Sequence, residues 1–170
     1  MSDTPEAPRS HTVTWDAPLS GVKYRKLSGA DLFEKIRLGE IPEPPFSRLL
    51  GFEVYDSAEG SFSMTLAPQE CHYNPMGCVH GGILATLLDT VMSASIHTVL
   101  QPGQGYLTLS INVNFIKAVF EHTGVVMAQG KVVSVRRQVA TAEGKILDTR
   151  GNVCATATTI CLISELPAAK

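Results

Sequence analysis

The chain has 170 residues, of which 44% are hydrophobic, and a formal net charge of -2 with acidic and basic residues interspersed. A chain of this length buries about two-thirds of its unfolded surface as one domain, so its stability requires neither disulfides nor a metal. The nearly balanced charge excludes a general nucleic-acid or anionic-membrane binder, because both classes need a clustered positive field. Any anionic ligand must therefore be bound by a local group of residues.

The cellular location and the state of the cysteines follow from the same survey. No apolar run reaches the ~18 residues of a membrane-spanning helix, and residues 1–18 lack the pattern of a signal peptide. These observations predict a cytoplasmic protein with no membrane segment. The cysteines are then expected to be reduced thiols that fill small apolar sites: Cys71, Cys78, Cys154 and Cys161. Their spacing differs from the Cys-x2-4-Cys pattern of zinc sites, so no metal is expected.

Composition divides the chain into two parts. Residues 1–27 are rich in Pro, Ser, Thr and Asp, with little periodic apolar content, which predicts a flexible or irregular arm. Residues 28–165 are expected to form one domain. This domain opens with a short amphipathic helix that starts at Ser28 and ends at Gly39, before three prolines.

The segment up to residue 67 is mixed. Residues 46–50 are expected to add a helical turn, with Leu49 and Leu50 packing inward. Residues 51–67 alternate between apolar and polar positions, which predicts one strand with a kink near residues 56–60.

Four strand-like runs follow the long helix that is predicted at residues 79–100. They lie at residues 106–115, 125–135, 139–147 and 153–163. The first alternates strictly between apolar and polar side chains from Leu107 to Phe115, so one face is expected to be buried and the other polar. Short connections predict an antiparallel meander, because parallel neighbours need longer crossovers. The third run has a small face that suits close approach of a helix: Ala140, Ala142 and Gly144.

The longest predicted helix spans residues 79–100, about 30 Å. Its apolar positions form a broad face that is expected to be buried beneath the sheet. The opposite face carries a polar stripe: Thr86, Asp89, Thr90, Ser93 and His97. A polar stripe of this kind ordinarily faces water, because carboxylates are rarely buried.

Two features favour a site at this helix. Asp89 lies at the edge of the stripe, where the small residues Gly82 and Ala85 leave room for a ligand. The helix also starts at Gly81 and Gly82, whose unpaired backbone N–H groups suit an oxygen with partial negative charge. Hydrolysis of an activated acyl group needs this combination, because a donor stabilises the oxyanion while a carboxylate activates water or attacks directly.

The pattern Asn74-x5-His80-Gly81-Gly82-x6-Asp89 resembles the signature of the PaaI-type hotdog acyl-CoA thioesterases. The order of elements is also similar, and the resemblance covers about residues 28–163. It implies an α+β hotdog fold, in which an antiparallel sheet of about five to six strands wraps around one long helix.

The same resemblance implies roles for individual residues. Asp89 is expected to be the general base or nucleophile, and the Gly81 N–H is expected to bind the thioester carbonyl, with Gly82 beside it in the substrate site. Asn74 would orient the attacking water or the carboxylate, and His80 would hold the loop and position the thioester. In this family a Ser or Thr of the first strand after the helix approaches the carboxylate from the neighbouring subunit, and Thr108 falls at that position.

Structural interpretations of these residues stay open. Asn74 precedes Pro and Gly in a typical turn sequence, His80 suits a helix start satisfied by backbone, and Thr108 is ordinary in a strand. Arg136 and Arg137 are the best candidates for the coenzyme A phosphates, since guanidinium groups pair with phosphate oxygens. A solvated turn explains them equally well.

The sequence therefore predicts an acyl-CoA thioesterase that uses no cofactor, since coenzyme A is part of the substrate. The sequence contains no Gly-x-Ser-x-Gly elbow of a serine hydrolase. It also lacks the motif of hotdog hydratases, in which an Asp and a His lie close together in a loop before the helix. The alternative is a hotdog module that binds acyl-CoA or serves assembly without turnover. We expect a homo-oligomer, either a dimer or a dimer of dimers, because one small sheet leaves an edge strand exposed.

Overall fold

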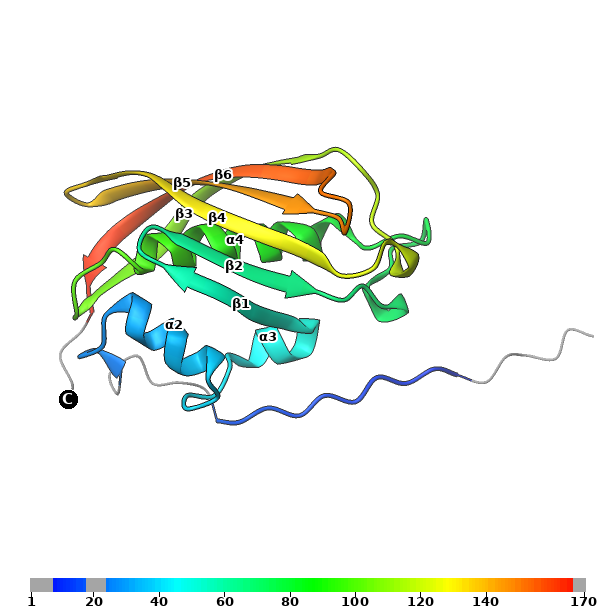
Figure 1. The fold of residues 1–170 in the computed structure, drawn as a ribbon, viewed down its shortest axis with the longest axis horizontal. Coiled ribbons are helices and arrows are strands. Elements are labelled where there is room, and N and C mark those ends of the chain that lie inside the picture. The colour runs from blue at the N-terminus through cyan, green and yellow to red at the C-terminus, as the bar shows by residue number, and fades with distance from the viewer. Residues whose placement is uncertain (1–7, 18–23, 167–170) are drawn as a thin grey trace, which may run out of the picture.

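The computed structural model describes residues 8–17 and 24–166 and shows one antiparallel sheet wrapped around one long helix, the hotdog fold (Figure 1). The helices are α2 (Gly29–Arg37), α3 (Pro45–Leu50) and α4 (Gly81–His97), with short 3-10 turns at η1 (Glu70–His72) and η2 (Glu121–Thr123). The strands are β1 (Phe52–Ala58), β2 (Ser61–Leu66), β3 (Gln104–Phe115), β4 (Val126–Arg136), β5 (Val139–Leu147) and β6 (Val153–Glu165). Their order in the sheet is β1-β2-β4-β5-β6-β3.

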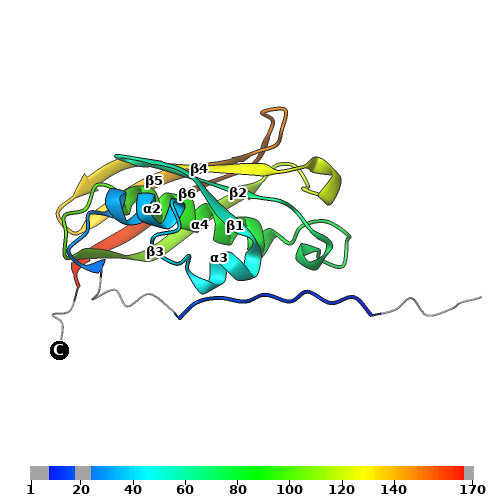
Figure 2. The ribbon, with the colours of Figure 1, turned by 60° about the horizontal axis from the view of Figure 1, so that its bottom comes forward.

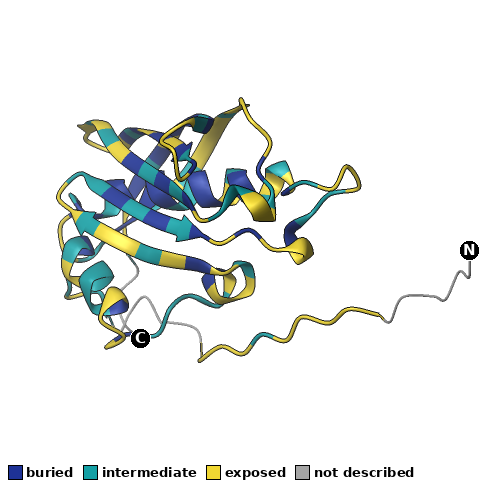
Figure 3. Cartoon of the chain, turned by 45° about the vertical axis from the view of Figure 1, so that its right-hand side comes forward, coloured by how far each residue is buried: buried dark blue, intermediate teal, exposed yellow. Residues whose placement is uncertain are grey.

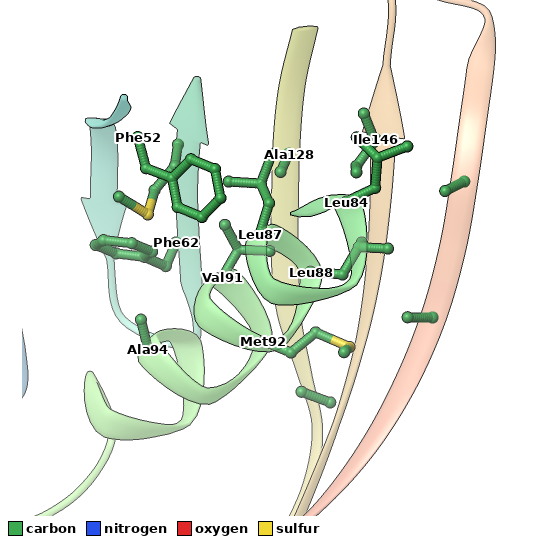
Figure 4. Close-up of a cluster of buried hydrophobic side chains, with 14 of the residues drawn as sticks. Phe52, Phe62, Leu84, Leu87, Leu88, Val91, Met92, Ala94, Ala128 and Ile146 are labelled. Carbon is green, nitrogen blue, oxygen red and sulfur yellow. The ribbon is translucent and has the colours of Figure 1, made fainter. Parts of the chain in front are cut away.

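Helix α4 forms the centre of the core. Its apolar side chains Leu87, Leu88 and Val91 are fully buried against residues of β1, β2, β4 and β5, as Figure 4 shows. Buried residues alternate with more exposed ones along β2 and β5 (Figure 3), so these strands turn one face to α4. Gly144 of β5 lies against the side chain of Met92, which confirms the small face expected on this strand.

Helices α2 and α3 lie on the same side of the sheet as α4 (Figure 2). The helix predicted from Ser28 is confirmed: the Ser28 side chain accepts a hydrogen bond from the Asp31 N–H, 3.1 Å away, which caps α2. The helical turn at residues 46–50 is confirmed as α3. The inward packing of Leu49 is wrong, since 53% of this residue is exposed, whereas Leu50 is partly buried against the core.

Two expectations about the strands are wrong. Residues 51–67 form the hairpin β1–β2 and not one kinked strand, because Gly60 adopts a positive φ of 73° and reverses the chain. The four later strands are not a simple meander, because β3 pairs with β6 and the chain then crosses to β4. The connection from β3 to β4 contains η2 and is too long for a tight hairpin turn.

The boundaries of the remaining parts are also defined. Helix α4 is shorter at both ends than the expected residues 79–100. Residues 8–17 of the predicted arm contain no helix or strand, and the rest of its first 23 residues lie outside the described residues. The four cysteines are free; Cys154 and Cys161 are buried as expected, whereas Cys71 is exposed. Within the described segments, none of the helices has the length and apolar character to cross a membrane.

Candidate active site

The start of α4 leaves one backbone donor free. His80 is the N-cap: its Nδ1 accepts a hydrogen bond from the Gly82 N–H at 2.9 Å, and its carbonyl accepts one from the Ile83 N–H, also at 2.9 Å. Among the hydrogen bonds between described residues, the Gly81 N–H donates none. Since unpaired N–H groups at a helix start carry partial positive charge, this donor is available to an anionic oxygen.

Asn74 lies in a tight turn before this helix. Its side-chain oxygen accepts hydrogen bonds from the Met76 N–H at 2.9 Å and the Cys78 N–H at 3.4 Å. Gly77 completes the turn with a φ of 74°. These contacts agree with the interpretation of Asn74 as a turn residue, and its role in orienting water stays a prediction.

Asp89 is held by a hydrogen bond from β3. The Thr108 hydroxyl donates to Asp89 Oδ1 at 3.0 Å, and both side chains are half-buried. This contact forms within one chain, whereas the family resemblance implied an approach from the neighbouring subunit. Ser93, one turn further along α4, is buried. The polar stripe of α4 therefore faces β3 in this region and not open water.

A β-bulge in β3 produces this contact. Thr108 pairs with Cys161, but Ser110 pairs with the adjacent Ile160, so Leu109 is an extra residue in β3. Directly paired residues lie on the same face of a sheet, and Cys161 belongs to the buried face of β6. Thr108 therefore shares the helix-facing side with the apolar residues beyond the bulge, and the strictly alternating strand predicted from the sequence is wrong.

The residues beyond the bulge form an exposed apolar strip beside the start of α4. The strip consists of Ile111, Val113 and Phe115, which pair with buried-face residues of β6. A Cβ added to Gly81 would lie 3.1 Å from the Phe115 ring, so this ring covers the helix start. Sequence reasoning missed Phe115 as a site residue, because regular alternation gives no sign of the bulge.

Aromatic rings surround the other side of the Asp89 contact. Tyr106 lies on the helix-facing side of β3, and its ring centroid is 5.5 Å from that of His97. Burial raises the pKa of Tyr106, although a hydrogen bond with Ser93 opposes the shift. Burial also lowers the pKa of His97, which favours its neutral form. This side of the site is therefore apolar and carries no charge at neutral pH.

The predicted phosphate-binding arginines lie elsewhere in the chain. Arg136 and Arg137 are exposed in the β4–β5 hairpin, where Arg137 has a φ of 40°. This hairpin lies at the opposite end of the sheet from the start of α4 (Figure 1). One chain does not bring the arginines to Gly81, and their phosphate-binding role stays a prediction.

Lys117, shortly after β3, pairs with a carboxylate of the turn between β5 and β6. Its Nζ donates to Asp148 Oδ2 at 2.6 Å. Hydrogen bonds from Lys117, and then from Asn152, hold the pKa of the Asp148 carboxyl far below its usual range. This ion pair ties the segment after β3 to the turn between β5 and β6.

A hollow of about 680 Å³ lies on the outer face of the sheet and away from Asp89. It carries both signs of charge, positive from Lys131 and Lys145 and negative from Asp56 and Glu143. Such a mixed surface gives no net attraction for a polyphosphate. In residues 8–17 and 24–166, no three His, Cys, Asp or Glu side chains are grouped to hold a metal ion.

Comparisons with known proteins agree with this architecture. The family model described as the thioesterase superfamily matches residues 76–155. A phenylacetic acid degradation-related protein from Ralstonia eutropha is 26% identical, with a TM-score of 0.69, and the match covers 76% of this chain and 98% of that protein. No curated protein matches the chain.

Two more distant structures share the fold. A thioesterase from Haemophilus influenzae is 19% identical, with a TM-score of 0.69 over 89% of this chain and 95% of its own. A Streptococcus mutans protein bound to acetyl-CoA is 20% identical, with a TM-score of 0.62 over 67% of this chain and 89% of its own. The family match, the first of these relatives and the sheet wrapped around α4 together support a hotdog thioesterase family for this chain.

Proposed function

We propose that the protein hydrolyses an acyl-CoA thioester to the free acid and coenzyme A. The observation that carries the proposal is the arrangement of α4, which has one free N–H at Gly81 and a half-buried carboxylate at Asp89. The acetyl-CoA bound by the Streptococcus mutans relative supports a coenzyme A ligand. A protein that only binds acyl-CoA has no need of a carboxylate at this place.

Each group has a defined task in the reaction. The Gly81 N–H donates to the thioester carbonyl oxygen and stabilises the oxyanion, an effect worth roughly 10²- to 10³-fold in rate. Asp89 takes a proton from water, whose oxygen attacks the carbonyl carbon; such general-base help is worth about 10²- to 10⁴-fold. The C–S bond then breaks, coenzyme A leaves as a thiolate and is protonated to the thiol. Direct attack by Asp89 is the alternative first step.

Thr108 orients the carboxylate for this task. Its hydroxyl occupies Asp89 Oδ1, and among the hydrogen bonds of the described residues Oδ2 accepts none. Oδ2 is therefore available to accept the proton of the attacking water.

The spacing of Gly81 and Asp89 requires a second chain. Eight residues correspond to about 12 Å along a helix axis, whereas both groups must lie about 3 Å from the reacting atoms. One carbonyl therefore cannot meet both groups of the same chain. We place the thioester between the Gly81 N–H of one chain and the Asp89 carboxylate of its partner in a homodimer.

The edge of the sheet supports this dimer. In the described sheet, β3 pairs only with β6 and leaves its other edge unpaired. The apolar strip Ile111, Val113 and Phe115 next to this edge is also partly exposed. Association of two β3 edges about a twofold axis would bury both and bring the two α4 helices together. Arg136 and Arg137 then remain our candidates for the coenzyme A phosphates.

Thiol release from a panel of acyl-CoAs tests the carboxylate. We expect Asp89→Asn to lose roughly a hundredfold or more in kcat while keeping the native mass and fold. Asp56→Asn makes the same chemical change on the exposed face of β1 and should leave the rate unchanged. If the wild type binds acyl-CoA but releases no thiol, the binding-module interpretation replaces this one.

A matched pair of substitutions tests the backbone donor. Gly81→Pro removes the N–H at the first helical position, where proline is tolerated and where the extended backbone of His80 suits it. Gly81→Ala adds a similar Cβ beside Phe115 but keeps the N–H. We expect a loss of roughly a hundredfold with proline and a much smaller loss with alanine.

Mixing two inactive variants tests the shared site. A heterodimer of Asp89→Asn and Gly81→Pro chains contains one intact pair of groups if each site uses two chains. Random mixing should then restore about a quarter of wild-type activity, because half of the dimers are mixed and each has one intact site of two. No recovery after verified subunit exchange would contradict the two-chain arrangement.

A further inference from the structure

A small apolar cavity of about 90 Å³ lies between helices α2 and α3 and the core, beside the Asp89 contact. Its walls are mainly aromatic and aliphatic: Phe33, Ile36, Phe46, Phe52, Val54, Phe62, Met64, Ala94 and Tyr106. Figure 4 shows Phe62 and Ala94 on the side of α4 that faces β1 and β2. The remaining lining residues are Glu43, Pro44, Ser47 and Thr90.

Two of the wall residues flank the carboxylate contact in the chain. Thr90 follows Asp89 on α4 and lines the cavity. Tyr106 lines it from β3, two residues before Thr108 and on the same helix-facing side, because the bulge comes only after Thr108. The cavity therefore lies close to the proposed catalytic contact, with Thr90 next to Asp89 on α4 and Tyr106 next to Thr108 on the same face of β3.

The principal polar groups of the walls already have partners. The Thr90 hydroxyl donates to the Thr86 carbonyl at 2.7 Å. Glu43 pairs with Arg48, with Nε and Oε2 3.0 Å apart, and Tyr106 shares a hydrogen bond with Ser93. The polar groups of these three residues are therefore already satisfied, and the cavity suits an aliphatic group.

We propose that this cavity receives the acyl chain and restricts the substrate to short aliphatic acyl-CoAs, an inference that rests on the proposed function. A cavity of about 150 Å³ holds one benzene molecule, so each carbon needs roughly 25 Å³ of cavity volume. At that density, 90 Å³ holds three to four carbons beyond the carbonyl. A phenyl ring does not fit, so aromatic acyl-CoAs are poor substrates.

Phe46 is the wall residue that sets this limit. Phe52, Phe62 and Met64 are almost fully buried in the core of the sheet. Phe46 belongs instead to the short helix α3, is 39% exposed and contacts Phe52 edge-on with ring centroids 6.3 Å apart. Removing its ring therefore enlarges the cavity toward solvent with the least damage to the core.

The test compares kcat/KM for butanoyl-, decanoyl- and phenylacetyl-CoA in the wild type, Phe46→Ala and Leu49→Ala. Leu49 lies on the same helix, is exposed and does not line the cavity. We expect kcat/KM of the wild type to be at least tenfold higher for butanoyl-CoA than for decanoyl- or phenylacetyl-CoA. Only the butanoyl chain fits the cavity, and each methylene buried there is worth roughly fourfold. Phe46→Ala should reduce that preference about tenfold, and Leu49→Ala should keep it.

A substitution that narrows the cavity should restrict the acyl chain further. Ala94→Val adds two methyl groups to the wall, so kcat/KM for butanoyl-CoA should fall about tenfold while acetyl-CoA is unaffected. Equal wild-type rates with butanoyl- and decanoyl-CoA, or identical preferences in Phe46→Ala and Leu49→Ala, would overturn the assignment of the cavity and leave hydrolysis itself standing. If the wild type hydrolyses no acyl-CoA at all, the proposed function is wrong and the cavity assignment is wrong with it.

Discussion

Replacing Gly130 by alanine tests how closely α4 packs on the sheet. A Cβ at this position of β4 would lie 2.1 Å from the Val91 carbonyl oxygen, and side chains essentially never approach a heavy atom within 3.0 Å. The two backbones must therefore separate by about 0.9 Å. Val91 follows Asp89 by two residues, so the displacement also reaches the proposed site.

The expected cost follows from the rigidity of the contact. Overpacking costs about 1–3 kcal/mol, and the upper end applies because backbone cannot rotate away. Alanine recovers about 0.5–1 kcal/mol relative to glycine in a strand. The net destabilisation should be about 2 kcal/mol or more, or a fall in Tm of about 4–8 °C for a domain of this size.

Gly144→Ala is the matched control. Gly144 pairs directly with Gly130 and is equally buried, but its new Cβ meets the flexible side chain of Met92, 2.8 Å away. We expect a change of less than about 1 kcal/mol in the free energy of unfolding. Urea unfolding at equal protein concentrations measures both. Equal midpoints for the two variants would refute the argument that backbone contact, and not burial, makes Gly130 indispensable.

Two further predictions concern polar contacts. Thr108→Val removes the donor to Asp89 and should lower kcat about 10- to 100-fold, the value of a hydrogen bond to a charged group; Thr108→Ser should retain most of the rate, and an unchanged kcat in the valine variant contradicts an orienting role. The depressed pKa of Asp148 means that its ionised form stabilises the fold fully above about pH 4 and that this contribution is lost as the pH falls further. Asp148→Asn should therefore be less stable than wild type at pH 7, and the difference in the free energy of unfolding should shrink steadily as the pH falls below about 4; a difference independent of pH in urea unfolding is the contrary result.

Local signals predicted several elements closely. The cap at Ser28 and the break at Gly39 defined α2, because both act within one or two turns of the chain. The strand expected at residues 139–147 coincides with β5 (Val139–Leu147), whose alternating pattern faces the helix on one side only. The central helix was also expected, although it is shorter at both ends and is capped by His80 and Thr98.

Features that depend on distant segments were not predictable in the same way. The pairing of β3 with β6 joins strands that are not neighbours in the chain, and nothing local to β3 specifies that partner. The reversal at Gly60 was interpreted as a kink, since one glycine is compatible with either. The presence of a strand can thus be predicted from the local sequence, whereas the order of the strands in the sheet cannot.

The same distinction between local and distant contacts applies to the candidate site. Asp89 and Gly81 were selected from their spacing on one helix. The partner of Asp89 was identified as Thr108, but its expected origin in a neighbouring subunit differs from the contact within the chain. The cover over Gly81 by Phe115 was missed, since it depends on the bulge and on the pairing with β6.

The β-bulge at Leu109 keeps two features of β3 on one face of the strand. Two side chains on one face of a regular strand are separated by an even number of positions, yet Thr108 and Ile111 are separated by three. If the bulge were straightened with every residue kept, either the hydroxyl or the whole apolar strip would turn to the outer face. Substitutions at this exposed position that keep the bulge should be harmless. Deleting Leu109 would leave Thr108 and Ile111 two positions apart, so the carboxylate contact and the surface proposed to bind a second chain would stay on one face.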